Sequence, residues 1–208
     1  MIIGLSGLIS VGKDTVADIL VKHHKFQKVS LADPMKRSVM EWFDWPVERL
    51  WGPSKFRSVE DPRYPGLTAR KVLQLLGTEV GRNCYPDVWA DYAMRVAKAL
   101  LKNGVRYRAD LGPMHGGTNI EENIAKGVVI SDVRFKNEMN AIRAAGGKVI
   151  RIKRPGKETP EWNHASETEQ LSVPDEWFDY VFINDGSLWG LEDKVATMLS
   201  HLGEKNES

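Results

Sequence analysis

A glycine-rich segment near the start of the chain constrains the possible fold more than any other feature. Residues 7–15 read GLISVGKDT and follow the short apolar run MIIGLS. Gly7, Gly12 and Lys13 have the spacing of a phosphate-binding loop, G-x-x-x-x-G-K-[ST]. The segment TVADILVKHH that comes next has helical periodicity. Because a strand, a glycine loop and a helix occur in the order that the motif requires, we expect a phosphate-binding loop here.

The residue after the lysine departs from that motif. Asp14 stands where a hydroxyl side chain is expected, and Thr15 follows one position later. Gly-Lys-Asp-Thr resembles the loop variant of adenylate-kinase-like nucleoside monophosphate kinases, G-x-x-x-x-G-K-x-T. The departure therefore narrows the class of enzyme and does not exclude nucleotide binding. The alternative interpretation is a strand-to-helix turn that contains Gly-Lys by chance.

The loop would hold a nucleoside triphosphate in two ways. Backbone N–H groups of a tight glycine loop point at phosphate oxygens, and the helix N-terminus adds a partial positive charge. Lys13 adds an ammonium group near the β- and γ-phosphates, and the Thr15 hydroxyl can reach Mg²⁺. Asp14 suits the helix dipole, but it must turn away from a triphosphate or reach the metal through water. The residues expected to bind ATP in this loop are Gly7, Ser10, Gly12, Lys13, Asp14 and Thr15.

Strand-like and helix-like segments alternate along the chain. The segments expected to contain strands are 1–6, 26–34, 127–132, 148–156 and 180–186. The segments with helical periodicity are 15–24, 35–43, 68–82, 87–102, 137–147 and 188–202. This alternation predicts a three-layer α/β/α fold of the P-loop type with a central parallel sheet, in which ligands bind beyond the carboxyl ends of the strands. We expect one domain over residues 1–208, with a monophosphate-binding helical segment at about 34–90, a polar surface insertion at about 103–127 and a lid at about 154–172.

Composition and charge argue against several classes of protein. The 29 Lys and Arg and 28 Asp and Glu side chains give a net charge of +1, so a broad nucleic-acid or membrane surface is not expected. The one cysteine, Cys84, allows no intrachain disulfide and is expected to be a reduced packing or loop residue. No segment approaches the ~20 apolar residues of a membrane span, and the first residues lack the pattern of a secretory signal. We expect a soluble protein of a reducing cytoplasm.

A second anion site is predicted at the end of strand 127–132. Asp132 follows the buried run GVVIS, and Arg134 comes two positions later. A carboxylate at a strand end can hold the hydration shell of Mg²⁺, while an arginine can bind a phosphate with two parallel hydrogen bonds. The alternative is a surface ion pair between Arg134 and Glu138.

Further candidates come from the helical segment and the lid. The basic residues placed where a monophosphate-binding segment would be inserted are Lys36, Arg70 and Arg82. Each of them taken alone is also compatible with a solvated surface position. Trp89 is compatible with stacking on a base or with packing in the core. Arg154 lies in the predicted lid with His164 and Glu167, where an arginine could neutralise charge on a transferred phosphoryl group; the alternative is a solvated loop.

Several segments together resemble one family, the deoxynucleoside monophosphate kinases of tailed bacteriophages. They span nearly the whole chain in order: residues 7–15, 31–36 (LADPMK), 67–82 (LTARKVLQLLGTEVGR) with Trp89, 131–138 (SDVRFKNE), 145–156 (AGGKVIRIKRPG), His164 with Ser166 and Glu167, and 183–188 (INDGSL). The resemblance implies an adenylate-kinase-like fold and transfer of the γ-phosphoryl group of ATP to a deoxynucleoside monophosphate, with Mg²⁺, in the host cytoplasm. It implies small-molecule substrates and no nucleic-acid or membrane partner. It leaves the oligomeric state open, with a homodimer as the commonest guess.

The resemblance also implies roles for individual residues. Around the acceptor nucleotide it places Lys36, Arg70, Gly77, Thr78, Arg82, Trp89, Asp132, Arg134 and Glu138. It favours contact between Trp89 and the acceptor, puts Arg154 in the lid, and lines the adenine end of ATP with Asn184, Asp185 and Gly186. Two departures stand out: Lys136 replaces a proline expected in many relatives, and segment 103–127 has no confident counterpart and no assigned function.

Two other functions fit parts of the sequence. Dephospho-coenzyme A kinases share the phosphate-binding loop and a compact α/β architecture. Because their acceptor is a sugar hydroxyl, a carboxylate base would be favoured there, and Asp33 could take that role. A nucleotide-dependent switch protein that acts through a partner is the alternative from another class, although the near-neutral charge and the lack of an obvious coiled coil argue against it.

The catalytic residues predicted from the sequence are Lys13, Arg134 and Arg154, all of which supply positive charge. Phosphoryl transfer depends mainly on positioning and charge stabilisation, so no protein nucleophile is expected. Replacing Lys13 with alanine should lower turnover by orders of magnitude and leave the fold intact. Steady-state kinetics and circular dichroism of Lys13→Ala test this, and full activity of the variant would contradict the assignment.

Overall fold

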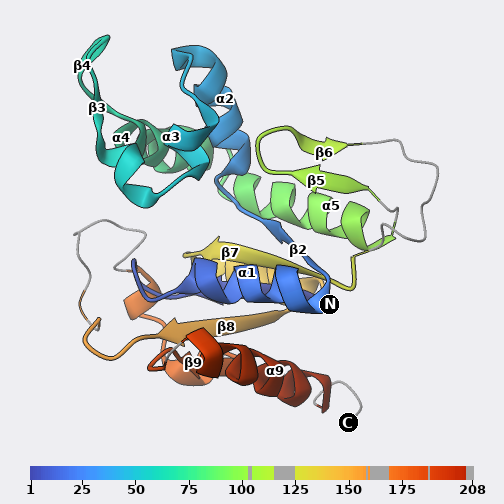
Figure 1. Cartoon of the computed structure of the whole chain (residues 1–208). Coiled ribbons are helices and arrows are strands. Elements are labelled where there is room, and N and C mark those ends of the chain that lie inside the picture. Colours follow the sequence, from blue (N-terminus) through green and yellow to red (C-terminus); the bar gives the residue numbers. More distant parts are fainter. Residues whose placement is uncertain (103–104, 115–124, 158, 160–168, 187, 205–208) are drawn as a thin grey trace.

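A five-stranded, all-parallel sheet forms the centre of the protein in the computed structural model, which describes residues 1–102, 105–114, 125–157, 159, 169–186 and 188–204. The strand order is β2-β7-β1-β8-β9 (Figure 1). The strands of this sheet are β1 (Ile2–Ser6), β2 (Phe26–Val29), β7 (Gly127–Val133), β8 (Lys148–Lys153) and β9 (Tyr180–Ile183). The five predicted strands are thereby confirmed, and all of their carboxyl ends lie at one edge of the sheet.

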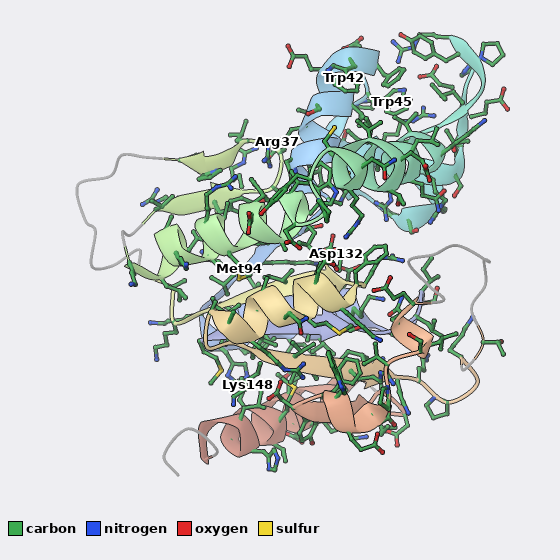
Figure 2. The ribbon with its side chains drawn as sticks, turned by 180° about the vertical axis from the view of Figure 1, so that it is seen from behind. Arg37, Trp42, Trp45, Met94, Asp132 and Lys148 are labelled. Carbon is green, nitrogen blue, oxygen red and sulfur yellow. The ribbon has the colours of Figure 1, made fainter. Side chains whose placement is uncertain are left out.

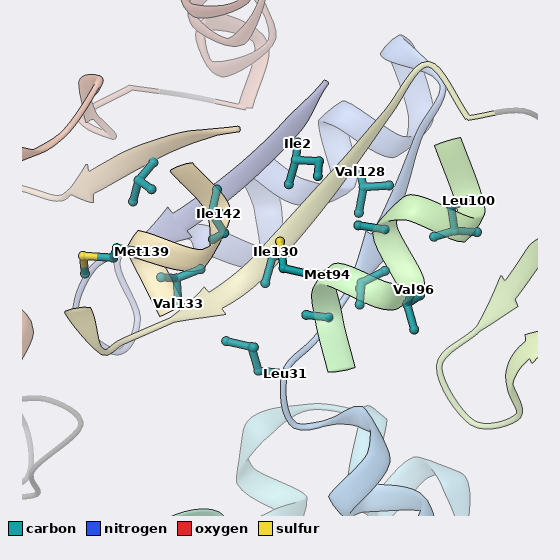
Figure 3. Close-up of a cluster of buried hydrophobic side chains, with 14 of the residues drawn as sticks. Ile2, Leu31, Met94, Val96, Leu100, Val128, Ile130, Val133, Met139 and Ile142 are labelled. Carbon is teal, nitrogen blue, oxygen red and sulfur yellow. The ribbon is translucent and has the colours of Figure 1, made fainter. Parts of the chain in front are cut away.

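Helices cover both faces of this sheet, because its central strands carry apolar side chains on both sides. On one face, α1 (Lys13–His24) and α9 (Leu188–Glu204) pack over Ile3, Leu5 and Ile150. On the other face, α5 (Val88–Lys102) and α7 (Lys136–Ala144) pack over Val128 and Ile130, together with other residues of the cluster in Figure 3. The predicted three-layer α/β/α fold is therefore confirmed.

A helical segment between β2 and α5 stands above the strand ends, with a small core of its own (Figures 1 and 2). Its elements are α2 (Asp33–Phe43), α3 (Val47–Trp51), the 3₁₀ helix η1 (Ser54–Ser58), β3 (Glu60–Asp61), β4 (Tyr64–Thr68), α4 (Ala69–Gln74) and η2 (Leu75–Arg82). Trp45 is 1% exposed and donates its indole N–H to Asp61 Oδ2 over 2.6 Å. This buried contact joins the end of α2 to the β3–β4 hairpin.

The structure differs from the sequence prediction within that segment. Residues 46–66, expected to be irregular or to form short helices, contain α3, η1 and a β3–β4 hairpin. Residues 68–82, expected to form one helix, form α4 followed by a π-helix, η2. The wider π turn accommodates Trp89: its indole N–H donates to the Gly77 carbonyl over 2.9 Å, and a Cβ atom on Gly81 would lie 2.3 Å from its ring.

The predicted surface insertion is also more ordered than expected where it is described. Its residues include a small hairpin of β5 (Arg106–Arg108) and β6 (Gly112–Met114). Tyr107 is 9% exposed and belongs to the same buried cluster as Ile130. The remaining short helix, η3 (Asp175–Trp177), precedes β9. Most of the predicted lid, with His164 and Glu167, falls outside the described residues.

Among the helices of the described part of the chain, none is both long and apolar enough to cross a bilayer.

The centre of the sheet is expected to dominate stability. Ile150 of β8 is fully buried between the neighbouring strands β1 and β9 and packs in the layer that contains α1 and α9. Ile150→Ala should lower the free energy of unfolding by about 2–5 kcal/mol, through lost apolar burial and the cavity left behind. Urea unfolding measures this change. Val21→Ala on the exposed side of α1 is the control, and an equal loss in both variants would contradict this description of the core.

Candidate active site

A deep cleft lies where the carboxyl ends of β1, β2 and β7 meet the helical segment. Its volume is about 790 Å³. It brings together twelve of the predicted site residues: Ser10, Lys13, Asp14, Lys36, Arg70, Gly77, Thr78, Arg82, Trp89, Asp132, Arg134 and Glu138. Segments more than a hundred residues apart in the sequence thus contribute to one cavity.

The glycine loop between β1 and α1 is fixed in a conformation that side chains rarely allow. Gly7 and Gly12 have φ angles of 147° and 97°, and Ser10 has a φ of 65°. A Cβ atom on Gly7 would lie 2.4 Å from the Ile152 carbonyl oxygen, and one on Gly12 would lie 2.2 Å from the amide nitrogen of Asn184. Both glycines are therefore required by backbone conformation and by close approach of the surrounding structure.

Lys13 lies inside the curve of this loop. Its ammonium group donates to the carbonyl oxygens of Gly7 and Leu8, at 2.6 and 2.7 Å. An ammonium group has three donors on a flexible stem, so Lys13 can exchange these carbonyls for phosphate oxygens. The loop and its lysine have the elements that the sequence predicted for a phosphate site.

Two buried amide side chains hold the loop from behind. Asn184, at the end of β9, donates from Nδ2 to the Val11 carbonyl over 2.8 Å. Gln170 accepts the Gly7 N–H at Oε1 over 3.0 Å. Gln170 is itself fixed by Arg151, whose guanidinium donates to the backbone carbonyl of Gln170 over 2.6 Å. Asn184 was predicted at the adenine end of ATP, whereas Gln170 was not predicted at all, because nothing local in the sequence marks it.

Asp14 is turned toward Lys28 of β2, at a distance of 2.9 Å. Partial desolvation at the edge of the cleft would raise the pKa of the Asp14 carboxyl, but Lys28, with smaller effects of Lys13 and Lys36, lowers it. The carboxylate is 79% exposed, so it can stay charged without entering the phosphate loop. Because the Asp14 side chain turns away from the loop, it avoids the repulsion of a bound triphosphate that is expected for an aspartate directly after Lys13.

Asp132 ties β7 to the loop that follows β2. Its carboxylate accepts the backbone N–H groups of Leu31 and Ala32, at 2.9 and 3.1 Å, and the hydroxyl of Ser30. Figure 2 shows Asp132 between the sheet and the helical segment. Since a carboxylate has about four acceptor positions, one remains for a metal-bound water. Asp132 thus holds the loop and can also serve the predicted metal.

Asp33, at the start of α2, is a buried carboxylate in the wall of the cleft. It accepts hydrogen bonds from Ser30 N–H at 3.0 Å, from the Trp51 indole at 2.9 Å and from the Tyr107 hydroxyl at 2.7 Å. Burial raises the pKa of Asp33, while Lys36, Tyr107 and Trp51 oppose the rise. With three donors around it, this side chain acts as a fixed anchor.

Cationic side chains converge on the same cleft from the helical segment and from β7. Arg57 donates to the Leu50 carbonyl over 2.8 Å, and Arg70 donates to Ser54 and Ser58 hydroxyls. Burial and the charges of Arg70 and Arg134 lower the pKa of Arg57. Burial likewise lowers the pKa of Lys36. Mutual repulsion of this kind is relieved by a bound anion. Arg57 was missed from the sequence because it lies in a stretch with no periodic pattern.

Glu138 and Arg82 form a buried ion pair on the other wall of the cleft. Glu138 also accepts the backbone N–H groups of Arg134 and Phe135, at 2.7 and 3.0 Å, which caps α7. Burial raises the pKa of Glu138, and Arg82 and the two N–H groups oppose this. The Arg82 guanidinium lies 3.7 Å from the centre of the Phe135 ring. The alternative pairing of Glu138 with Arg134 is not what the structure has; Glu138 positions the Arg134 backbone instead.

A second cavity of about 430 Å³ lies behind the loop, at the carboxyl ends of β8 and β9. It is lined by Gly7, Arg154, Lys157 and Ile183, among others. The structure therefore separates Arg154 from the first cleft, and Arg154 is exposed. Gly186 is exposed just beyond β9, and Asn184 lies beneath the loop.

The residues proposed for Mg²⁺ fit an ion that is held mainly by phosphates and water. Within the described ranges, no group of three or more His, Cys, Asp or Glu side chains is placed to bind a metal. Thr15 is half-buried in the first turn of α1, and Asp132 retains an acceptor position. Magnesium at phosphate-transfer sites needs few protein ligands and keeps several waters.

Comparison with known proteins points to one family. The family model of deoxynucleotide monophosphate kinase matches residues 114–195. A provisionally named deoxynucleotide monophosphate kinase of Acanthamoeba polyphaga mimivirus is 31% identical over 99% of this chain and 100% of its own length. The deoxynucleotide monophosphate kinase of Escherichia phage RB69 is 24% identical over 95% of this chain and 99% of its own.

Among solved structures, dephospho-CoA kinase from Campylobacter jejuni is similar to this chain with a TM-score of 0.48 and 15% identity, covering 99% of this chain and 98% of the other.

The converging cations predict a measurable response to a dianion. Sodium sulfate at about 10 mM should raise the melting temperature above that in sodium chloride of equal ionic strength, because a ligand of the native state stabilises it. Arg57→Gln should remove at least half of this increase. Arg95→Gln, on the exposed side of α5, is the control for general salt effects. Equal sulfate responses in the wild type and both variants would show that Arg57 is not part of an anion site.

Proposed function

Since the chain belongs to the deoxynucleotide monophosphate kinase family, we propose that it transfers the γ-phosphoryl group of ATP to a deoxynucleoside monophosphate, giving ADP and the diphosphate. The observation that carries the proposal is the composition of the cleft. Lys13 and the glycine loop form one side, and Arg57, Arg70 and Arg134 line the same cavity. Two nucleotides joined through their phosphates need positive charge of this kind at both ends.

The chemistry asks for positioning more than for a reactive side chain. In-line transfer spreads charge over the oxygens of the moving phosphoryl group, and fixed cations stabilise that charge. In this proposal the loop amides and Lys13 hold the donor phosphates, while Arg134, with Arg57 and Arg70, binds the acceptor phosphate. Lys13 keeps contact with the transferred group as it moves. A general base is unnecessary, because the attacking phosphate oxygen carries no proton that must be removed.

Magnesium, when bound, would supply positive charge that neutralises the donor phosphates. Thr15 would bind it directly through the hydroxyl, and Asp132 would hold one of its waters. Asp132 can do this because the hydrogen bonds from Ser30, Leu31 and Ala32 use three of its about four acceptor positions and leave one for the water. The same carboxylate then sets both the metal and the wall of the acceptor pocket.

The nucleosides occupy the two ends of the site in this proposal. The acceptor lies against Trp89, Gly77 and Thr78, and its phosphate reaches Lys36 and the arginines. The half-buried ring of Trp89 supports edge contact rather than insertion between rings, since its N–H is engaged with Gly77. The adenine of ATP lies in the second cavity near Arg154 and Gly186. Asn184 supports the loop there rather than reading the base.

The hydroxyl-acceptor alternative is less well supported. It requires a carboxylate that can take a proton from a sugar hydroxyl. Asp33, the residue available for that role, accepts three hydrogen bonds from Ser30, Trp51 and Tyr107. An anchor of this kind favours a phosphate acceptor, which needs no base.

The expected location of the enzyme is the cytoplasm of a host cell, where ATP and monophosphates are both present.

A coupled assay of ADP release tests the proposal directly. The acceptors are dGMP, dTMP, dCMP and dephospho-CoA, each with ATP and Mg²⁺. Turnover is expected with at least one deoxynucleoside monophosphate and only background release with dephospho-CoA. Lys13→Ala gives the background for each acceptor.

Two results would contradict the proposal. One is turnover with dephospho-CoA alone, which would restore Asp33 as a base. The other is slow ATP hydrolysis that no monophosphate stimulates but that a protein or DNA partner does, which would indicate a nucleotide-dependent switch.

A further inference from the structure

The β5–β6 hairpin is attached to the acceptor half of the cleft through one buried side chain. Arg106 and Arg108 are exposed, whereas Tyr107 between them points inward and is 9% exposed. Its hydroxyl donates to Asp33 Oδ2 over 2.7 Å and lies 3.3 Å from the Tyr92 hydroxyl. The hairpin therefore reaches the wall of the cleft with a polar group, although it contributes little of the lining itself.

A second attachment comes from α2 and fixes the turn of the hairpin. Arg37 donates to the Ala109 carbonyl and to the Tyr92 hydroxyl, both at 2.8 Å. A Cβ atom on Gly112 would lie 3.4 Å from the Arg37 guanidinium carbon, so the hairpin packs directly on this side chain. Figure 2 shows Arg37 at the junction of α2 and the hairpin. The hydrogen bonds Arg37–Tyr92 and Tyr107–Asp33 thus attach this region to two positions of α2 that lie one helical turn apart on the same face.

Asp33 connects the hairpin to other residues of the cleft. It accepts the Ser30 N–H on one side and the Trp51 indole N–H on the other. The Trp51 ring in turn lies 5.4 Å from the Lys36 ammonium group. Asp132 holds the same loop from the sheet. Consequently Asp33 and Asp132 fix the start of α2 between them, and Tyr107 is one of the three donors that hold Asp33.

From this geometry we propose that Tyr107 is a positioning residue for the acceptor nucleotide. Its hydroxyl, through Asp33, sets where Lys36 and Trp51 stand in the acceptor pocket, while the glycine loop is anchored independently by Asn184 and Gln170. Loss of the hydroxyl acts on the acceptor side and leaves the ATP side unchanged. This inference rests on the acceptor pocket of the proposed function, and it gives the hairpin a role.

The test is the variant Tyr107→Phe, which removes the hydroxyl and keeps the ring in the core. In the coupled assay the KM for the accepted deoxynucleoside monophosphate should rise about fivefold to twentyfold, with the KM for ATP and the kcat within about twofold of the wild type. A purely structural role would move the KM values of both substrates together, or neither. Tyr180→Phe is the matched control: this half-buried tyrosine packs 5.5 Å from His201 in the layer of α9, away from the cleft.

The pH dependence gives a second readout. Tyr107 helps to keep the Asp33 carboxyl ionised, so without its hydroxyl the raised pKa of Asp33 should rise further. The acid limb of kcat/KM for the monophosphate should therefore shift to higher pH in Tyr107→Phe, and not in Tyr180→Phe. If Tyr107→Phe does not melt cooperatively, Arg37→Lys, on the outer side of the same network, should give the same split between the two KM values.

The outcomes separate this inference from the function on which it rests. No turnover of any monophosphate by the wild-type protein would reject the proposed function. Wild-type turnover combined with unchanged monophosphate KM in Tyr107→Phe, or with equal increases for ATP and monophosphate, would reject the positioning role alone.

Discussion

Gathering positive charge around one cleft is the constraint on which the rest of this structure depends. Lys13, Lys36, Arg57, Arg70 and Arg134 all line the same cavity, and their mutual repulsion opposes folding. Three carboxylates offset it, two of them buried (Asp33 and Glu138) and one half-buried (Asp132). Each of them is also an anchor, because it accepts hydrogen bonds from backbone N–H groups of neighbouring loops. The groups that balance the charge thus also fix the geometry of the site.

The two halves of the cleft are held by different devices. The glycine loop is kept in its strained conformation by side-chain amides, Asn184 and Gln170, which carry no charge and leave its positive potential intact. The half of the cleft proposed to bind the acceptor is held by carboxylates, which lie behind the loops and helix ends that carry the cations. In the proposed function, neutral anchors next to the glycine loop and acidic anchors next to the acceptor pocket would suit two anions of different charge. Because the anchors differ, substitutions in one half of the cleft should alter the binding of ATP, and substitutions in the other half should alter the binding of the acceptor.

How much could be predicted from the sequence follows from the range of the interactions involved. The glycine loop was found because its residues are adjacent in the chain, and the predicted parallel sheet and membership of the family are confirmed. The role of Tyr107 could not be found, because its partner Asp33 lies 74 positions away. Gln170 lies 163 positions from Gly7, and Arg57 sits in a stretch without periodicity. The π-helix was missed because the helical periodicity of residues 68–82 does not mark it, and its contact Trp89 follows it in the sequence.

The central claim is that the phosphates of two nucleotides meet in one cleft. The glycine loop with Lys13 binds the phosphates of one nucleotide, and the arginines bind the phosphate of the other. The most direct measurement is a crystal structure with a bisubstrate analogue in which adenosine and a deoxynucleoside are linked by a chain of phosphates. The account predicts that the phosphate chain runs from the amides of residues 7–15 to Arg134, Arg57 and Arg70, with the deoxynucleoside against Trp89. A deoxynucleoside-side phosphate that contacts none of these arginines would contradict it.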